Sequence, residues 1–148
     1  CDMLETPQST SQVLTKRPDR MRELLSDPSF GSAANIWIGT SVEDSSVLDR
    51  IDELRTIPGF IRFISFEPLI GPVGAVDLTD VDWAIVGGES GPRARPIQLD
   101  WVQQIEARCR AYGTAFFFKQ WGGITPKSGG RDHDGRERNE FPSVLRAA

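Results

Sequence analysis

The stretch Asp100–Lys119, which reads DWVQQIEARCRAYGTAFFFK, joins an amphipathic helix to a strand. Apolar residues recur at helical spacing as far as Tyr112, Asp100 can cap the first turn, and Gly113 can end the helix. The aromatic run that follows is typical of a strand covered on both faces. A helix that leads directly into a buried strand belongs to a β–α–β unit and predicts a parallel sheet.

The same alternation extends toward the amino terminus. We expect strands at Gln12–Thr15, Asn35–Thr40, Ile61–Phe66, Asp82–Val86 and Ala115–Lys119. We expect helices at Pro18–Ser26, Asp44–Arg55 and Asp100–Tyr112. The stretch Pro68–Asp80 has no helical period, which predicts a structured loop in place of a crossover helix.

The strand spacing indicates the fold class. Successive strands begin about 21 to 33 residues apart, close to the roughly 31 residues per unit of an eight-unit barrel. The sequence therefore predicts an α/β fold, a partial TIM-like (β/α) barrel with about five parallel strands and flanking helices. We assign residues 1–123 to this barrel domain and residues 124–148, rich in Gly, Arg, Asp and Pro, to an irregular carboxyl-terminal tail.

Composition excludes several classes of protein. The chain has 148 residues, with 17 Lys and Arg against 21 Asp and Glu, and a net charge of -4. It has no apolar run near the roughly 20 residues of a membrane span and no secretory leader, so we expect a soluble, cytoplasmic protein. The negative charge argues against a protein that coats nucleic acid, but leaves a local basic patch open.

The cysteines and the single histidine do not predict a metal site. Cys1 and Cys109 are too few for a disulfide scaffold and lack the paired spacing of a zinc site. Cys109 lies on the apolar stripe of a helix, and His133 has no ligand at a suitable spacing. Because the chain begins with Cys1 rather than Met, we expect residues upstream to be missing.

Each predicted strand ends in polar residues, and in parallel α/β folds ligands bind at the carboxyl ends of the strands. Loops are polar in any case, so one such residue proves little, but the set favours a binding site. The ionisable residues just after the strands are Lys16, Arg17, Glu43, Glu67, Glu89 and Lys119.

Three of these residues are our candidates for catalysis, namely Glu67, Lys119 and Glu89. Glu67 precedes Pro68, which restricts its backbone to extended geometry. Lys119 follows three phenylalanines, and desolvation there would favour the neutral amine of a Schiff-base lysine. An anion-binding role and an ion pair with one of the glutamates are the alternatives.

Other residues near the strand ends are candidates for binding. The pairs Gly87-Gly88 and Gly122-Gly123 permit close backbone approach, as phosphate-binding loops require. Arg93 and Arg95 lie between two prolines and could clamp a phosphate or carboxylate, or could form a solvated loop face. The candidate substrate-binding residues are Lys16, Arg17, Gly87, Gly88, Arg93, Arg95, Gln120 and Trp121.

Five strings in order along the chain carry a family resemblance. They are VLTKRP (13–18), IWIGTSVE (36–43), RFISFEPLIGPV (62–73), DWAIVGGESG (82–91) and FFFKQWG (116–122). On these strings the chain resembles the phage gene-product 37/68 family, a family of unknown function. Its full-length members look like radical S-adenosylmethionine proteins, in which three clustered cysteines near the start would ligate a [4Fe-4S] cluster.

The resemblance implies that this chain is the carboxyl-terminal portion of such a barrel, with the last five of eight strands and without the amino-terminal ones. It also implies that Thr40, Ser41 and Glu43 contact the cofactor in the complete protein. The cysteine segment is absent here, so we expect no cofactor in this chain and no radical chemistry from it alone. S-adenosylmethionine and [4Fe-4S] are implied only for full-length relatives.

Two other interpretations stay open. One is a cofactor-free lyase or isomerase that uses Lys119 as a Schiff-base nucleophile and Glu67 or Glu89 as a proton carrier. The other is a non-enzymatic binding or dimerising module that associates through two exposed sheet edges. The substrate would be an unknown small molecule or nucleotide, a membrane partner is not expected, and a nucleic-acid partner is left open.

Overall fold

The computed structural model describes residues 8–28 and 34–143, which form one parallel sheet covered by helices. The strands are β1 (Ser11–Thr15), β2 (Ile36–Ser41), β3 (Ile61–Phe66), β4 (Trp83–Gly87) and β5 (Ala115–Gln120). They lie in sequential order, and each adjacent pair is parallel. The predicted α/β class and parallel sheet are thus confirmed. Within the described residues the sheet does not close into a barrel.

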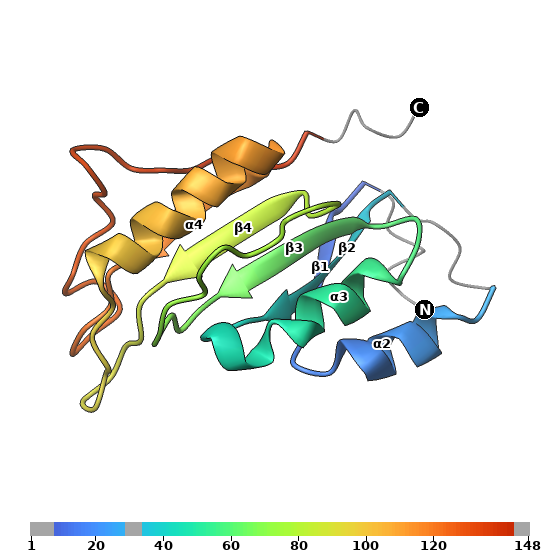
Figure 1. Ribbon diagram of the computed structural model, residues 1–148, viewed down its shortest axis with the longest axis horizontal. Coiled ribbons are helices and arrows are strands. Elements are labelled where there is room, and N and C mark those ends of the chain that lie inside the picture. Colours follow the sequence, from blue (N-terminus) through green and yellow to red (C-terminus); the bar gives the residue numbers. More distant parts are fainter. Residues whose placement is uncertain (1–7, 29–33, 144–148) are drawn as a thin grey trace.

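The helices lie on one side of the sheet (Figure 1). They are α2 (Pro18–Leu25), the short 3-10 helix η1 (Ser45–Val47), α3 (Asp49–Arg55) and α4 (Leu99–Tyr112). Pro18 occupies the first turn of α2, and Gly113 ends α4 with a φ of 69°. The helix expected over Asp44–Arg55 is divided, because the Asp44 carboxylate accepts a hydrogen bond from the Ser46 backbone and starts a 3-10 turn. No helix in residues 8–28 and 34–143 is long and apolar enough to cross a membrane.

The two faces of the sheet carry different side chains, because successive residues of a strand point to opposite faces. One face packs against the helices in the main core, which includes Ile38, Ile64, Val86 and Phe118. The opposite face carries a second cluster of aromatic residues, Trp37, Phe63 and Trp83. No helix in the described part of the chain covers this second face (Figure 1).

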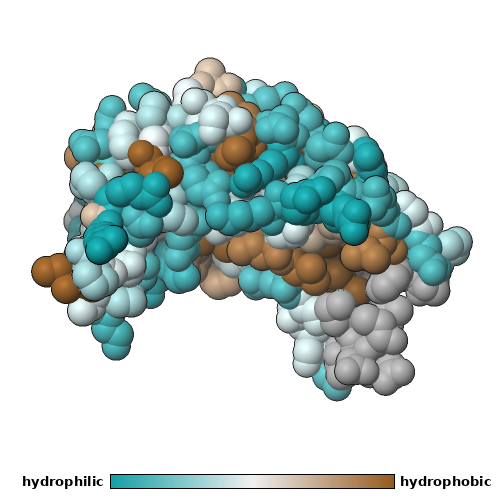
Figure 2. Space-filling view, turned by 90° about the horizontal axis from the view of Figure 1, so that it is seen from below, coloured by the Kyte–Doolittle hydropathy of each residue, from teal (hydrophilic) through white to brown (hydrophobic). Residues whose placement is uncertain are grey.

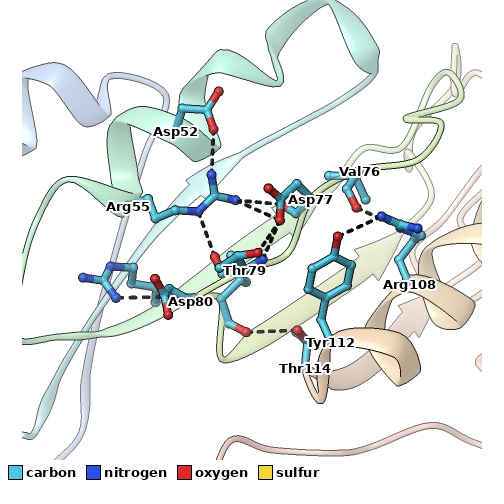
Figure 3. Close-up of polar contacts among 11 residues, drawn as sticks. Asp52, Arg55, Val76, Asp77, Thr79, Asp80, Arg108, Tyr112 and Thr114 are labelled. Carbon is cyan, nitrogen blue, oxygen red and sulfur yellow. Dashed lines mark hydrogen bonds and ion pairs between the residues drawn. The ribbon is translucent and has the colours of Figure 1, made fainter.

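The connection between β3 and β4 contains no helix, as the sequence predicts. Figure 3 shows how arginine side chains hold it. Arg55 of α3 donates to the backbone carbonyls of Thr79 and Asp77, at 2.8 Å in each case. Arg108 of α4 donates to the carbonyl of Val76 at 2.9 Å. These bonds satisfy carbonyl groups that a crossover helix would otherwise pair internally.

The carboxyl-terminal tail has no helix among its described residues, but it packs along β5. The amide of Phe118 donates to the carbonyl of Arg138 at 2.9 Å, and the amide of Glu140 donates to that of Phe116 at 3.2 Å. The sequence predicts two exposed sheet edges, whereas the tail pairs with the outer edge of β5. Of the two edges, only that of β1 has no strand partner in the described chain.

Candidate functional site

A groove of about 910 Å³ crosses the helix-free face of the sheet. In Figure 2 the molecule has an arched outline with a hollow on its lower side, beside which hydrophobic residues gather. The groove extends from Gln12 and Leu14 of β1 to the tail segment that contains Lys127 and Arg131. Its floor is largely apolar and is formed by Phe63, Trp83, Ile85 and Phe117. A bound molecule would therefore lose water on one side at little cost.

Two candidate catalytic residues meet where this groove reaches the carboxyl ends of the strands. The Lys119 ammonium lies 3.0 Å from Oε1 of Glu67, and both residues line the groove. The side chains are 52% and 23% exposed, respectively, so the pair is open to solvent and to a ligand. The structure thus contains the ion pair that the sequence offered as one alternative for Lys119.

The backbone around Glu67 is fixed by its neighbours. The amide of Leu69 donates to the Gly87 carbonyl at 2.9 Å, and the amide of Ile70 donates to that of Glu43 at 3.0 Å. A side chain at Gly87 would also approach Glu67, since a Cβ atom there would lie 3.2 Å from its carboxyl carbon. The sequence at this edge therefore positions the Glu67 carboxylate before any ligand binds.

A smaller pocket of about 500 Å³ adjoins the groove. It shares Glu67, Lys119 and Gln120 and adds Glu89 and Ser90. Gln120 donates to Oγ of Ser90 at 3.1 Å, which leaves its amide oxygen available as an acceptor. The candidate residues Glu67, Lys119, Glu89 and Gln120 thus lie around one pair of adjoining cavities.

Glu89 is bound to a neighbouring arginine. Both carboxylate oxygens accept from the Arg95 guanidinium at 2.8 Å, and the Arg95 amide donates to one of them. These hydrogen bonds lower the pKa of Glu89 to about 2. A carboxylate held ionised in this way is a poor proton donor near neutral pH and instead shapes the loop after β4.

The three candidate cofactor contacts lie outside the groove. The Thr40 hydroxyl is fully buried and donates to the Thr15 carbonyl at 2.9 Å. Ser41 is also buried, and its carbonyl accepts from Arg50 at 2.8 Å. Glu43 pairs with Lys16 and with Arg50. Burial would raise the pKa of Glu43, but the hydrogen bond and charge of Lys16 outweigh it and lower that pKa.

The glycines after β4 and β5 contact each other rather than an open loop. A Cβ atom at Gly88 would lie 1.9 Å from the Trp121 carbonyl oxygen, and one at Gly122 would lie 2.2 Å from the Glu89 carbonyl oxygen. The close backbone approach that the sequence predicts is therefore made between these two strand ends. The Trp121 ring packs against Phe118 of the main core.

The remaining candidate residues are separate from the groove. Arg17 forms an exposed ion pair with Asp19, and Arg93 is exposed on the loop after β4. Lys16 pairs with Glu43 and does not line either cavity. The rule that groups Lys16 and Arg17 with Lys119, namely that all three follow strands, gives no information about distance.

Sequence reasoning missed a buried cluster of charges beneath α4. Glu106 is 7% exposed, and its carboxylate accepts from Arg138 at 3.0 Å and lies 2.8 Å from Nε2 of His133. His133 is fully buried. Glu106 lies four residues after Val102 and three before Cys109, on the apolar stripe of α4, and that position was the available signal.

The described residues do not fit an iron–sulfur cluster. No group of three or more His, Cys, Asp or Glu residues in the described ranges could hold a metal ion. Cys109 is the one cysteine in those ranges, and burial raises its pKa to about 12. A thiol buried in the core as a protonated group is not a cluster ligand. Cys1 lies outside the described residues.

Comparison with known proteins relates the chain to a protein family. The model of a protein family described as "Protein of unknown function (DUF5131)" matches residues 2–142. No curated protein and no solved structure matches the chain.

Proposed function

The chain belongs to the DUF5131 family, and from that premise we propose that it is the carboxyl-terminal part of a (β/α) barrel enzyme whose substrate binds in the groove. The observation that carries this proposal is the difference between the two faces of the sheet. Helices cover one face, and the other is hollow, apolar and bordered by Glu67 and Lys119.

The strand order and the position of the helices favour part of a barrel wall rather than a doubly wound sheet. A doubly wound sheet reverses its strand order at a switch point and carries helices on both faces. Here the order is sequential from β1 to β5, and the helices occupy one side (Figure 1). In a barrel the helix-free face is the interior, and substrates bind at the carboxyl ends of its strands. The Glu67–Lys119 pair lies at that end.

Each residue of the Glu67–Lys119 ion pair can have its own role toward a substrate. The Lys119 ammonium presents three donors and can hold a carboxylate, phosphate or carbonyl oxygen of a substrate. The Glu67 carboxylate can accept a proton or a hydroxyl hydrogen bond on the same side of the groove. A substrate that displaces one of the two residues from the ion pair frees the other for acid–base catalysis.

We also propose a more specific assignment, to the phage gene-product 37/68 family and to radical S-adenosylmethionine-like chemistry. It is supported by the five strings quoted above and by sequential parallel strands with helices on one side. Cluster ligands would have to come from outside the described residues, so we propose that this chain alone is inactive in radical chemistry. Thr40, Ser41 and Glu43 stay candidate cofactor contacts of the complete protein.

The test is to sequence the reading frame upstream of the Cys1 codon and to express any longer chain. We expect the frame to continue into three clustered cysteines. The longer protein should then show iron–sulfur absorbance after anaerobic reconstitution, and the 148-residue chain should not. A stop codon close upstream, or a longer protein that binds no cluster, overturns the radical assignment.

A second candidate is the cofactor-free lyase or isomerase, because Lys119 projects into the groove beside a carboxylate. Its test is borohydride trapping of a carbonyl compound, with Lys119→Ala as the comparison. Equal labelling of both proteins excludes this candidate. The half-exposed position and the pairing of Lys119 favour binding over nucleophilic attack, which needs a desolvated free amine.

A further inference from the structure

We propose that the groove binds a nucleotide, with the base on the apolar floor and the phosphate at the cations beside β5. This inference rests on the proposed function, because it names the substrate class of the same site.

The charge of the groove differs from that of the whole chain. Three cations line it, Lys119, Lys127 and Arg131, against one carboxylate, Glu67. The chain as a whole carries a net charge of -4. A local excess of positive charge favours an anionic ligand, because steering depends on the local field.

Two of the cations are available to such a ligand. Glu67 is occupied by Lys119, so it does not neutralise the tail segment that carries the other two. Lys127 is exposed and has no ion-pair partner within the described ranges. Arg131 donates to Oδ1 of Asn139 at 2.5 Å and has a longer contact to Glu137 at 3.8 Å, but its Nε atom is buried with no hydrogen-bond partner in the described chain. These groups can hold a phosphate through charge-assisted bonds.

The floor of the groove suits a planar ring. Phe117 is partly exposed in this floor, whereas Phe63 and Trp83 are only 2% and 3% exposed and support it from within the aromatic cluster, with ring centroids of neighbouring members 5.9 Å apart. The Arg131 guanidinium already lies over the Phe117 ring, 5.4 Å from its centroid. A nucleobase uses the same kinds of contact, stacking on aromatic faces and on guanidinium planes.

Two amide side chains lie at opposite sides of the groove, Gln12 on β1 and Gln120 on β5. Amide groups match the donors and acceptors on the edges of nucleobases. The chain of an apolar anion such as a fatty acid has no groups that could form hydrogen bonds with these two amides. The combination of ring surface, amides and cations therefore favours a nucleotide over other organic anions.

The test is calorimetric titration of the 148-residue chain with guanosine monophosphate, guanosine and inorganic phosphate. We expect guanosine monophosphate to bind at least about tenfold more tightly than guanosine or phosphate, because each half of the ligand contributes. Lys127→Gln and Arg131→Gln should each weaken binding of the monophosphate by about tenfold. The matched control, Arg20→Gln, removes an exposed cation of α2 that does not line the groove.

Equal affinity for the three titrants, or equal weakening by the control variant, overturns the nucleotide proposal. Circular dichroism of each variant verifies that it is folded. The two proposals fail separately. Absence of nucleotide binding leaves the reconstitution of a longer chain untouched, and a longer chain without a cluster leaves nucleotide binding by this chain untouched.

Discussion

Glu67 and Lys119 form an ion pair across strand β4, which contributes Gly87 between them. The strand order β3, β4, β5 places one strand between the two charged residues. The Lys119 ammonium nevertheless lies 3.0 Å from the carboxylate. The absent side chain at position 87 provides the space, since a Cβ atom there would lie 3.2 Å from Oε2 of Glu67.

A larger residue at position 87 should therefore separate the pair. Gly87→Val has no backbone penalty from positive φ and acts through volume alone. We expect the coupling between Glu67→Gln and Lys119→Met to be about 0.2 to 1 kcal/mol in the native background, as for exposed pairs. In the Gly87→Val background it should vanish. Double-mutant cycles from urea unfolding measure both values, and an unchanged coupling contradicts the interpretation.

The buried charges beneath α4 should dominate the effect of mutations on stability. Glu106→Gln leaves Arg138 buried without its carboxylate partner, so we expect a loss of about 3 to 5 kcal/mol in unfolding free energy. Arg110 contacts the same carboxylate, but its side chain is 68% exposed. Arg110→Gln is the matched control and should cost less than about 1 kcal/mol. Equal losses would show that burial does not set the energetics of this cluster.

The same carboxylate should contribute to acid sensitivity. Burial would raise the pKa of Glu106, but hydrogen bonds from Arg138 and His133 outweigh burial and lower it from the ordinary 4.5. A group whose folded pKa is depressed stabilises the fold above its unfolded pKa and loses that contribution as pH falls through the folded value. Unfolding free energy should thus fall below pH 4.5, less steeply in Glu106→Gln than in the native chain. Parallel curves for the two proteins contradict this assignment.

The loop between β3 and β4 should depend on its arginines. Arg55→Gln removes the donors to the carbonyls of Thr79 and Asp77, which a crossover helix would have paired. We expect a loss of about 1 to 3 kcal/mol and faster amide exchange over residues 76–80. Hydrogen-exchange mass spectrometry locates the effect. Arg20→Gln, on the exposed face of α2, serves as the control and should leave that segment protected.

The Cys109 thiol should be unreactive in the folded protein. It is 1% exposed, and burial raises its pKa to about 12, so the reactive thiolate is absent near neutral pH. In a Cys1→Ser background, Ellman's reagent should label one thiol per chain in denaturant and none in buffer. Fast labelling of the native protein would contradict the position of Cys109 in the core.

Local patterns explain why most of the fold could be predicted. The five strands agree with expectation to within about one residue at each end, because apolar and aromatic runs bounded by polar residues mark strands reliably. The division of Asp44–Arg55 into two helices depended on the hydrogen bonds that the amide and hydroxyl of Ser46 donate to the Asp44 carboxylate, which periodicity does not detect.

The site was predictable in its residue types but not in its pairings. The carboxyl-end rule selected Glu67 and Lys119 from residues 52 apart, yet it selected Lys16 and Glu43 equally well. The contacts of the tail residues could not be predicted in this way, because an irregular segment has no period from which to infer its neighbours. These residues are Lys127, Arg131 and His133. Only three-dimensional packing places Arg131 over Phe117 and His133 beside Glu106.

The pairing of the tail with β5 determines how many edges of this sheet can accept another strand. With one edge occupied, only the β1 edge of the described sheet can accept a further strand. A protein with one unpaired sheet edge can pair with one further chain, whereas a protein with two unpaired edges can add chains without limit. The tail thus limits edge-to-edge association to one further strand, and a barrel that continues from β1 would stay open at the outer edge of β5.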